Sequence, residues 1–140
     1  MSKQALIEAL NDQLSAEYQA VIQYIQYSAV VTGPHRPELV TFFRAEIPDE
    51  QIHAQYLADK IAALGGMPTT KAKPVATATE AKELLENVLK AETEAIAAYT
   101  KLIELAEKAG EVGIRIQMEN FVQDENTHHD ETMKILQGGW

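Results

Sequence analysis

Two copies of one arrangement of acids and histidines stand out in this sequence of 140 residues. In each copy a glutamate is followed 33 residues later by a second glutamate and then, three residues further on, by a histidine. The six residues are Glu17, Glu50, His53, Glu92, Glu125 and His128. Because residues three apart on a helix point to the same side, each Glu-x-x-His pair can hold one metal ion.

The four glutamates fall on the apolar stripes of segments with helical periodicity. Glu17, for example, lies between Leu14 and Val21 on such a stripe. Carboxylates in a dry interior cost on the order of several kcal/mol each, and four that converge would also repel one another. No lysine or arginine occupies the stripes at these levels, so buried salt bridges do not explain the acids. Two divalent cations would supply the missing positive charge.

The agreement between the two copies extends to neighbouring residues. Asp49 and Asp124 immediately precede the second glutamates, and Tyr24 and Tyr99 each follow a first glutamate by seven residues. This matched spacing predicts two half-bundles related by a pseudo-two-fold axis around one paired site. Tyr24 is a candidate electron or hydrogen-bond donor. The alternative for both tyrosines is a core position with the hydroxyl bonded to a carboxylate.

Four long helical segments must position these residues, and no segment alternates like a strand. We expect one all-α domain over residues 1–140, with helices at about 3–32, 37–65, 79–109 and 112–137. Turns at Gly33-Pro34 and between Gly110 and Gly113 are short, so the first two helices and the last two each form an antiparallel hairpin. Pro48 predicts a kink in the second helix, or a helix that begins afresh there.

The segment 66–79 between the second and third helices is polar and contains two prolines. Extended, its residues reach roughly 46 Å at about 3.3 Å each. A helix of about 28 residues is roughly 42 Å long, so this connection can cross the whole bundle. Thr77 and Glu80 have the spacing of a capping box ahead of the third helix.

Composition limits the classes of function. The chain has 21 acidic and 12 basic side chains, which argues against nucleic-acid binding because phosphate contacts need clustered Lys and Arg. The absence of cysteine leaves oxygen and nitrogen ligands for any metal, which suits iron, manganese, calcium or zinc. No run is long and apolar enough to span a membrane, and no secretion signal is recognisable at the start, so we expect a cytoplasmic protein.

These residues resemble the pattern of ferritin-like di-iron proteins, in which two helices supply a Glu and two supply Glu-x-x-His, and bacterioferritins are the most similar. The resemblance covers essentially the whole chain, including the crossover. It implies a ferritin-like four-helix bundle in which all six residues bind two iron ions. Glu50 and Glu125 would bridge the irons, and Tyr24 would lie beside them.

The resemblance also implies supporting carboxylates around the histidines. Asp124 would accept a hydrogen bond from the imidazole of His53, and Asp49 would accept one from His128. Such bonds fix the tautomer of a ligand histidine.

Several positions depart from the family pattern. Gln51 replaces the methionine with which haem-binding bacterioferritins hold haem, so haem is not expected. The family's fifth helix has no counterpart before Trp140, which argues against a 24-subunit cage. Ala45 replaces a histidine that holds iron on the inner shell surface in some bacterioferritins. Ala95 stands where rubrerythrins usually have a further glutamate.

The leading functional hypothesis is a di-iron ferroxidase that oxidises Fe(II) to Fe(III) with dioxygen or hydrogen peroxide, in iron storage or detoxification. One alternative is a rubrerythrin-like peroxidase or oxidase whose metals stay bound. Another is a non-catalytic scaffold that holds manganese or zinc. We also expect a homodimer or larger homo-oligomer, with Ile22, Ile25 and Leu102 as candidate contact residues.

Overall fold

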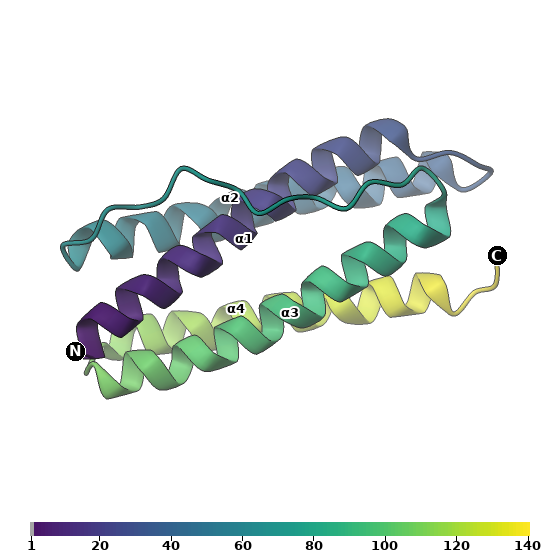
Figure 1. Ribbon diagram of the computed structural model, residues 1–140. Coiled ribbons are helices and arrows are strands. Elements are labelled where there is room, and N and C mark those ends of the chain that lie inside the picture. The colour runs from purple at the N-terminus through teal and green to yellow at the C-terminus, as the bar shows by residue number, and fades with distance from the viewer. Residues whose placement is uncertain (1) are drawn as a thin grey trace.

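The computed structural model describes residues 2–140 as four long helices joined by two short turns and one long crossover (Figure 1). The helices are α1 (Ser2–Val30), α2 (Arg36–Ala63), α3 (Ala81–Lys108) and α4 (Val112–Leu136). α1 packs along α2 and α3 along α4, and α1 also contacts α3. The predicted all-α four-helix bundle with a long crossover is confirmed, and each helix begins and ends within two residues of its predicted bounds.

Two apolar clusters lie on either side of the middle of the bundle. One contains the first half of α1 with the second half of α2, including Leu10 and Leu57, and it also contains Leu102 and Phe121. The other contains the remaining ends of the helices, including Phe43. The candidate ligand residues of every helix lie between these two clusters along the chain. Apolar burial at both ends thus stabilises helices whose centres carry acids.

Leu102 does not belong to a contact surface. Its side chain is 1% exposed and packs in the first apolar cluster, three residues after the buried Tyr99 on the same face of α3. The expectation that Leu102 lies in a dimer surface is therefore wrong. Ile22 and Ile25 are about half exposed, at 48% and 53%.

Pro48 lies inside a continuous helix, since α2 runs unbroken from Arg36 to Ala63. The alternative in which a new helix begins at Pro48 is therefore wrong. Proline lacks the N–H group that would bond to the carbonyl of Arg44. Both Pro48 and Arg44 are exposed, so water can reach this part of the helix surface.

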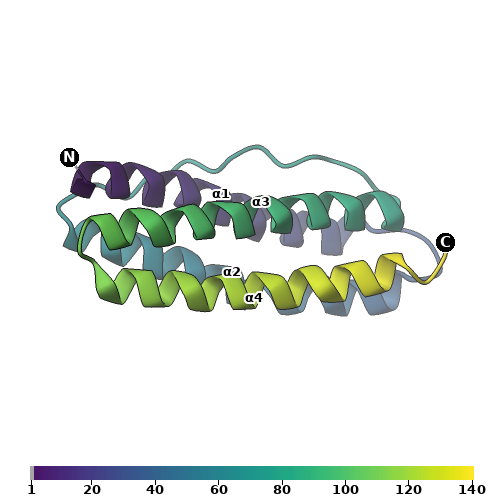
Figure 2. The same ribbon diagram turned by 90° about the horizontal axis from the view of Figure 1, so that it is seen from below.

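The crossover runs along the outside of α1 for the length of the bundle (Figures 1 and 2). Near its end, the backbone N of Thr32 donates a 3.0 Å hydrogen bond to the carbonyl of Thr79. This bond and a bridge between Thr32 and Glu80 keep the chain extended up to the start of α3. The predicted capping box at Thr77 is wrong, because Glu80 is the N-cap residue and makes no side-chain cap bond.

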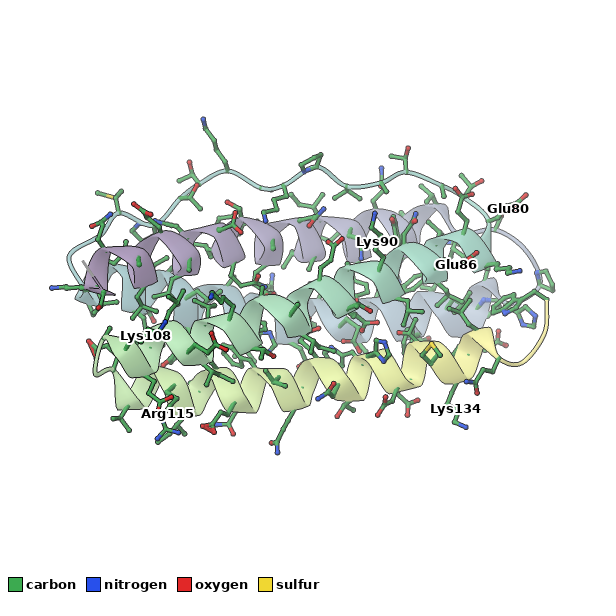
Figure 3. All side chains as sticks on the ribbon, turned by 60° about the horizontal axis from the view of Figure 1, so that its bottom comes forward. Glu80, Glu86, Lys90, Lys108, Arg115 and Lys134 are labelled. Carbon is green, nitrogen blue, oxygen red and sulfur yellow. The ribbon has the colours of Figure 1, made fainter. Side chains whose placement is uncertain are left out.

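Charged side chains cover the outside of the bundle. Arg115 and Lys134 on α4, for example, point away from it into solvent (Figure 3). None of the four described helices combines the length and the apolar character that crossing a bilayer requires.

Candidate metal centre

The bundle brings all six residues of the repeated pattern together at its middle. The five residues Glu17, Glu50, His53, Glu92 and Glu125 are each no more than 4% exposed, and His128 is partly buried. They form two overlapping groups whose ligand atoms all lie within 4.8 Å of one another. One group contains Glu17, Glu50, His53 and Glu125, and the other contains Glu92, Glu125 and His128. Glu125 is shared, as a bridging ligand must be.

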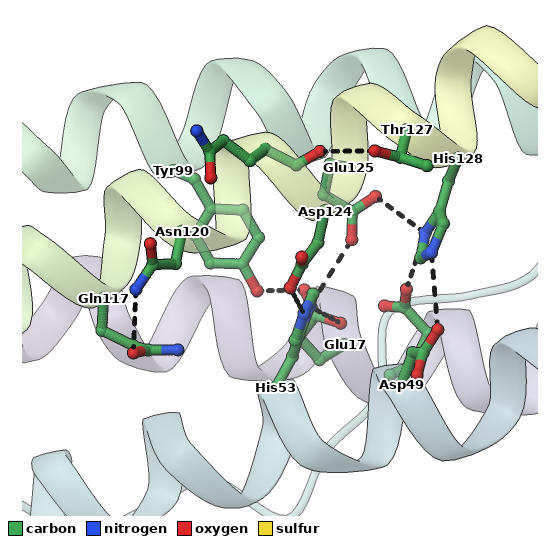
Figure 4. Close-up of polar contacts among 12 residues, drawn as sticks. Glu17, Asp49, His53, Tyr99, Gln117, Asn120, Asp124, Glu125, Thr127 and His128 are labelled. Carbon is green, nitrogen blue, oxygen red and sulfur yellow. Dashed lines mark hydrogen bonds and ion pairs between the residues drawn. The ribbon is translucent and has the colours of Figure 1, made fainter.

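His53 presents its two ring nitrogens to different partners. Nδ1 lies 3.5 Å from Oε1 of Glu125 and 3.9 Å from Oε2 of Glu17, so it faces the centre. Nε2 lies 3.2 Å from Oδ2 of Asp124, which accepts the hydrogen bond when Nε2 carries the proton (Figure 4). This tautomer leaves the lone pair of Nδ1 free for a metal.

His128 has the same orientation but a different partner. Nδ1 lies 3.8 Å from Oε1 of Glu50 and 4.0 Å from Oε2 of Glu125. On the other side of the ring, Nε2 lies 3.5 Å from Oδ2 of Asp49 but only 2.8 Å from Oε2 of Glu46. Glu46 is therefore the nearer carboxylate to His128, although the resemblance assigned this role to Asp49.

Glu46 is the residue of the site that sequence reasoning missed. It is 8% exposed, and it lies one helical turn before Glu50 on α2. The position 75 residues later, which the repeat would pair with it, is Phe121. The ring of Phe121 packs on His53 with a centroid distance of 4.0 Å. The signal available in the sequence was one further acid on the apolar stripe of the second helix.

The two matched tyrosines also differ in their contacts. The hydroxyl of Tyr99 donates a short hydrogen bond to Oε1 of Glu17, and Gln13 donates a 3.0 Å bond to the same oxygen. Tyr24 is buried beside the centre, but its hydroxyl has no hydrogen-bond partner within residues 2–140. Tyr99 thus has the expected contact with a carboxylate, whereas Tyr24 does not.

Burial and mutual repulsion perturb the acids of the centre. Desolvation, followed by the charges of Glu17 and Glu125, raises the pKa of Glu50 well above its usual range. Desolvation likewise raises the pKa of Glu92 to about 8, although the nearby hydroxyl of Thr132 lowers it. Without a metal, Glu92 therefore holds a proton near neutral pH, and the pKa of Glu50 is shifted in the same direction.

The pKa values of both histidines are raised, which favours the charged imidazolium form. Burial by itself lowers the pKa of His128, but the contact with Glu46 and the surrounding carboxylates outweigh it and raise the pKa to about 9. For His53 the same opposition holds: burial lowers its pKa, and the nearby carboxylates of Glu125 and Glu17 outweigh this and raise it. In the metal-free centre, a pKa of about 9 makes His128 an imidazolium at neutral pH, and its positive charge lies close to the carboxylates.

The donor atoms fit a pair of divalent ions. Several buried atoms that face the centre have no hydrogen-bond partner: Glu17 Oε2, both carboxylate oxygens of Glu92, Glu125 Oε1, and Nδ1 of His53 and His128. Buried polar atoms without partners are costly, and metal ions would bind all of them at once. Carboxylate oxygen with imidazole nitrogen suits iron, manganese and zinc.

A four-helix bundle that directs two carboxylate–histidine half-sites at one point belongs to a known class of metal-binding folds. Residues 7–138 match the family model described as a ferritin-like domain. The chain therefore belongs to the ferritin-like family, and this membership together with the carboxylate–histidine cluster supports iron binding.

Particular relatives refine this assignment. The bacterioferritin of Brucella melitensis is 31% identical over 126 residues, which cover 89% of this chain and 78% of that protein. The bacterioferritin of Streptomyces coelicolor is 30% identical, covering 89% of this chain and 75% of that protein. The predicted resemblance to bacterioferritins is confirmed.

Solved structures agree with the sequence relatives. A ferritin-like diiron-carboxylate protein from Bacillus anthracis superposes with a TM-score of 0.95 at 40% identity, covering 97% of this chain and 98% of that one. The Desulfovibrio desulfuricans bacterioferritin, whose structure describes a diiron site, superposes with a TM-score of 0.90 at 26% identity. The match covers 97% of this chain and 80% of that one.

Proposed function

We propose that this protein is a ferroxidase that acts in iron storage or detoxification. Two Fe(II) ions would bind as substrates at the six residues of the centre and give up one electron each. One hydrogen peroxide takes up these two electrons and two protons and becomes two waters. One dioxygen takes up the same electrons and protons and becomes hydrogen peroxide. The observation that carries the proposal is the set of buried carboxylate and imidazole atoms without hydrogen-bond partners. These atoms belong to two overlapping groups of residues that could each hold a metal ion.

Each group of residues at the centre would have its own role in this reaction. Four carboxylates offset the charge of two divalent ions, and their hard oxygen atoms favour Fe(III) over Fe(II). Glu125, common to both groups, and Glu50, which reaches His128, would bridge. Asp124 and Glu46 would hold the imidazoles with Nδ1 toward the centre. Tyr24 would supply a further electron or a hydrogen bond.

Stopped-flow absorbance tests this proposal directly. Anaerobic protein with two Fe(II) per chain is mixed with oxygenated buffer or with hydrogen peroxide, and Fe(III) formation is followed. We expect oxidation faster than in buffer, and a Glu92→Ala variant that approaches the buffer rate. Oxidation by the unmodified protein at the buffer rate would eliminate the ferroxidase.

A second candidate is a peroxidase or oxidase whose metals stay bound. The Bacillus anthracis relative, 40% identical, is described as a ferritin-like diiron-carboxylate protein, a description that fits this function as well as a ferroxidase. Counting iron retained per chain after aerobic loading separates the two functions. A plateau near two would contradict storage. Retention of manganese or zinc without any oxidation would support the scaffold alternative.

The proposed partners are Fe(II), the oxidant and further copies of the chain. Tyr18, Ile22, Ala54 and Ala58 line a groove of about 600 Å³ between α1 and α2, and Ile25 is exposed one turn beyond Ile22. A structurally similar Bacteroides fragilis protein, 25% identical with a TM-score of 0.88, is described as dodecameric. We infer that the face of α1 and α2 joins two copies into at least a homodimer.

A further inference from the structure

A cavity of about 270 Å³ between α1 and α3 joins the protein surface to the candidate centre. At its inner end it is lined by all four glutamates of the centre: Glu17, Glu50, Glu92 and Glu125. Toward the outside its lining includes the exposed residues Asp12 and Glu94. Much of the wall between these ends consists of alanines: Ala16, Ala20, Ala91, Ala95 and Ala98. Their small side chains leave the space between the two helices open.

The opposite side of the centre is arranged differently. A cavity of about 300 Å³ between α2 and α4 is lined by both histidines together with Asp49, Ile52, Asp124 and Thr127. None of the four glutamates of the centre lines it. An ion that approached from this side would first meet Asp49, Asp124 and the Nε2 edges of the imidazoles, where Glu46, Asp49 and His128 form a third group of possible ligands. From the side of α1 and α3, the same ion would meet the four glutamates of the centre directly.

The crossover places a lysine at the outer end of the cavity between α1 and α3. The backbone N of Lys73 donates a 3.1 Å hydrogen bond to the carbonyl of Ser15, and the side chain of Gln19 bonds to the carbonyl of Pro74. The chain is thus fixed against α1 at this point. Nζ of Lys73 lies 3.2 Å from Oδ2 of Asp12. Within the described residues 2–140, Lys73 is the one cationic side chain in the cavity lining.

We propose that the Asp12–Lys73 ion pair, at the mouth of the cavity between α1 and α3, controls the rate at which divalent metal ions enter this cavity and reach the centre. The inference rests on the proposed metal-binding function. The ammonium of Lys73 repels an incoming cation and neutralises the carboxylate of Asp12 that would attract one. Because the pair is exposed, it opens readily and acts on the rate of entry rather than on the final affinity.

Anaerobic stopped-flow binding of Co(II), followed by its visible absorption, tests the proposal without any oxidation. The variant Lys73→Glu reverses the charge at the mouth and keeps the backbone bond to Ser15. We expect its Co(II) association rate to rise by roughly threefold to tenfold. The variant Asp12→Asn, which leaves Lys73 unpaired, should slow association. Both effects should shrink in 1 M salt, where charges are screened beyond about 3 Å.

Lys71→Glu is the matched control, because Lys71 is exposed on the same crossover two residues away and does not line the cavity. It makes the same change in net charge and should alter the rate far less than Lys73→Glu. Equal acceleration by the two variants, or none by Lys73→Glu, would overturn the control of entry by the Asp12–Lys73 pair. Equilibrium titration should give two Co(II) per chain in every variant. Failure of the unmodified protein to bind Co(II) would instead overturn the proposed function itself.

Discussion

Oε2 of Glu46 lies 2.8 Å from Nε2 of His128, on the edge of the ring that faces away from the centre. In the other half of the site, Phe121 occupies the corresponding position and packs on the ring of His53. His53 relies on Asp124, which is more than half exposed, whereas His128 has a buried carboxylate. The two half-sites therefore present the same types of candidate ligand, but different side chains contact their histidines. This difference predicts unequal affinities for the two metal ions.

Replacing Glu46 should weaken one metal site and spare the other. Glu46→Gln removes the charge that orients the imidazole of His128, and loss of such support typically costs tenfold to hundredfold in affinity. Calorimetric titration with Co(II) should show one of two binding steps weakened by roughly that factor. Asp49→Asn is the control, because Asp49 lies further from Nε2, at 3.5 Å, and should have a smaller effect. A larger loss in Asp49→Asn would identify Asp49 as the acceptor.

The two residues proposed to bridge the irons, Glu50 and Glu125, should be indispensable for oxidation. Glu50→Ala and Glu125→Ala each remove a carboxylate that reaches both histidine half-sites, so we expect fast Fe(II) oxidation to disappear in either variant. Glu131→Ala, at an exposed position of the same helix as Glu125, should oxidise Fe(II) at the unmodified rate. Stopped-flow absorbance at two Fe(II) per chain measures the oxidation rate of all three variants and of the unmodified protein. Full activity in Glu50→Ala or Glu125→Ala would contradict the bridging assignment.

Metal binding should release protons and become tighter as pH rises. The pKa of Glu92 is raised to about 8 and that of His128 to about 9 in the metal-free protein, so both hold protons at pH 7 that a metal must displace. Titration of Mn(II) in buffers with different ionisation enthalpies measures the number released. We expect a release near two protons from these residues. A binding enthalpy that is independent of the buffer would contradict this.

The same shifts make the metal-free protein less stable in alkaline solution. Folding raises the pKa of both groups. At any pH between the unfolded-state pKa and the folded-state pKa of a group, the folded protein therefore binds more protons at that group than the unfolded protein does. The contribution of Glu92 is complete below pH 4.5 and is lost as pH rises through about 8. That of His128 is complete below pH 6.5 and is lost through about 9. The melting temperature of metal-free protein should therefore fall from pH 6 to pH 9, and the gain on adding Zn(II) should grow.

Much of the fold and of the centre follows from sequence periodicity. The spacing of apolar residues and the glycine turns are local signals, so four helices and two hairpins could be predicted. The six residues could be predicted to meet because each predicted helix has an acid on its apolar stripe near the middle, and four of these acids recur with two histidines at matched spacing. The structure brings them together, and their role as ligands stays a prediction.

Features that depend on contacts between elements could not be predicted in this way. Glu46 has no partner in the repeat, and on the stripe it competed with its neighbour Ile47. Leu102 is buried because α3 packs against both α1 and α4, which widens the buried face of the helix. The start of α3 depends on Thr32, which is distant in sequence and bonds to Thr79. Such contacts are set by tertiary packing and override local propensity.

The two tyrosines provide a matched test of support for the glutamates. Tyr99→Phe removes the donor to buried Glu17, so we expect the free energy of unfolding of the metal-free protein to fall by about 1–2 kcal/mol. Tyr24→Phe removes no hydrogen bond within residues 2–140 and should lie within about 0.5 kcal/mol of the unmodified protein. Urea unfolding monitored by circular dichroism measures both. A larger loss in Tyr24→Phe would show that its hydroxyl bonds to the centre.

A charge placed on the exposed face of α1 should separate the subunits. Ile25 is 53% exposed beyond the groove between α1 and α2, and an unpaired ammonium is costly to bury in an interface. We expect Ile25→Lys to weaken self-association by at least roughly tenfold, which sedimentation velocity over a range of concentrations would measure. Ile116→Lys is the control, because Ile116 is similarly exposed, at 50%, but lies on α4. An equal effect of both substitutions would contradict a contact that is specific to the face of α1 and α2.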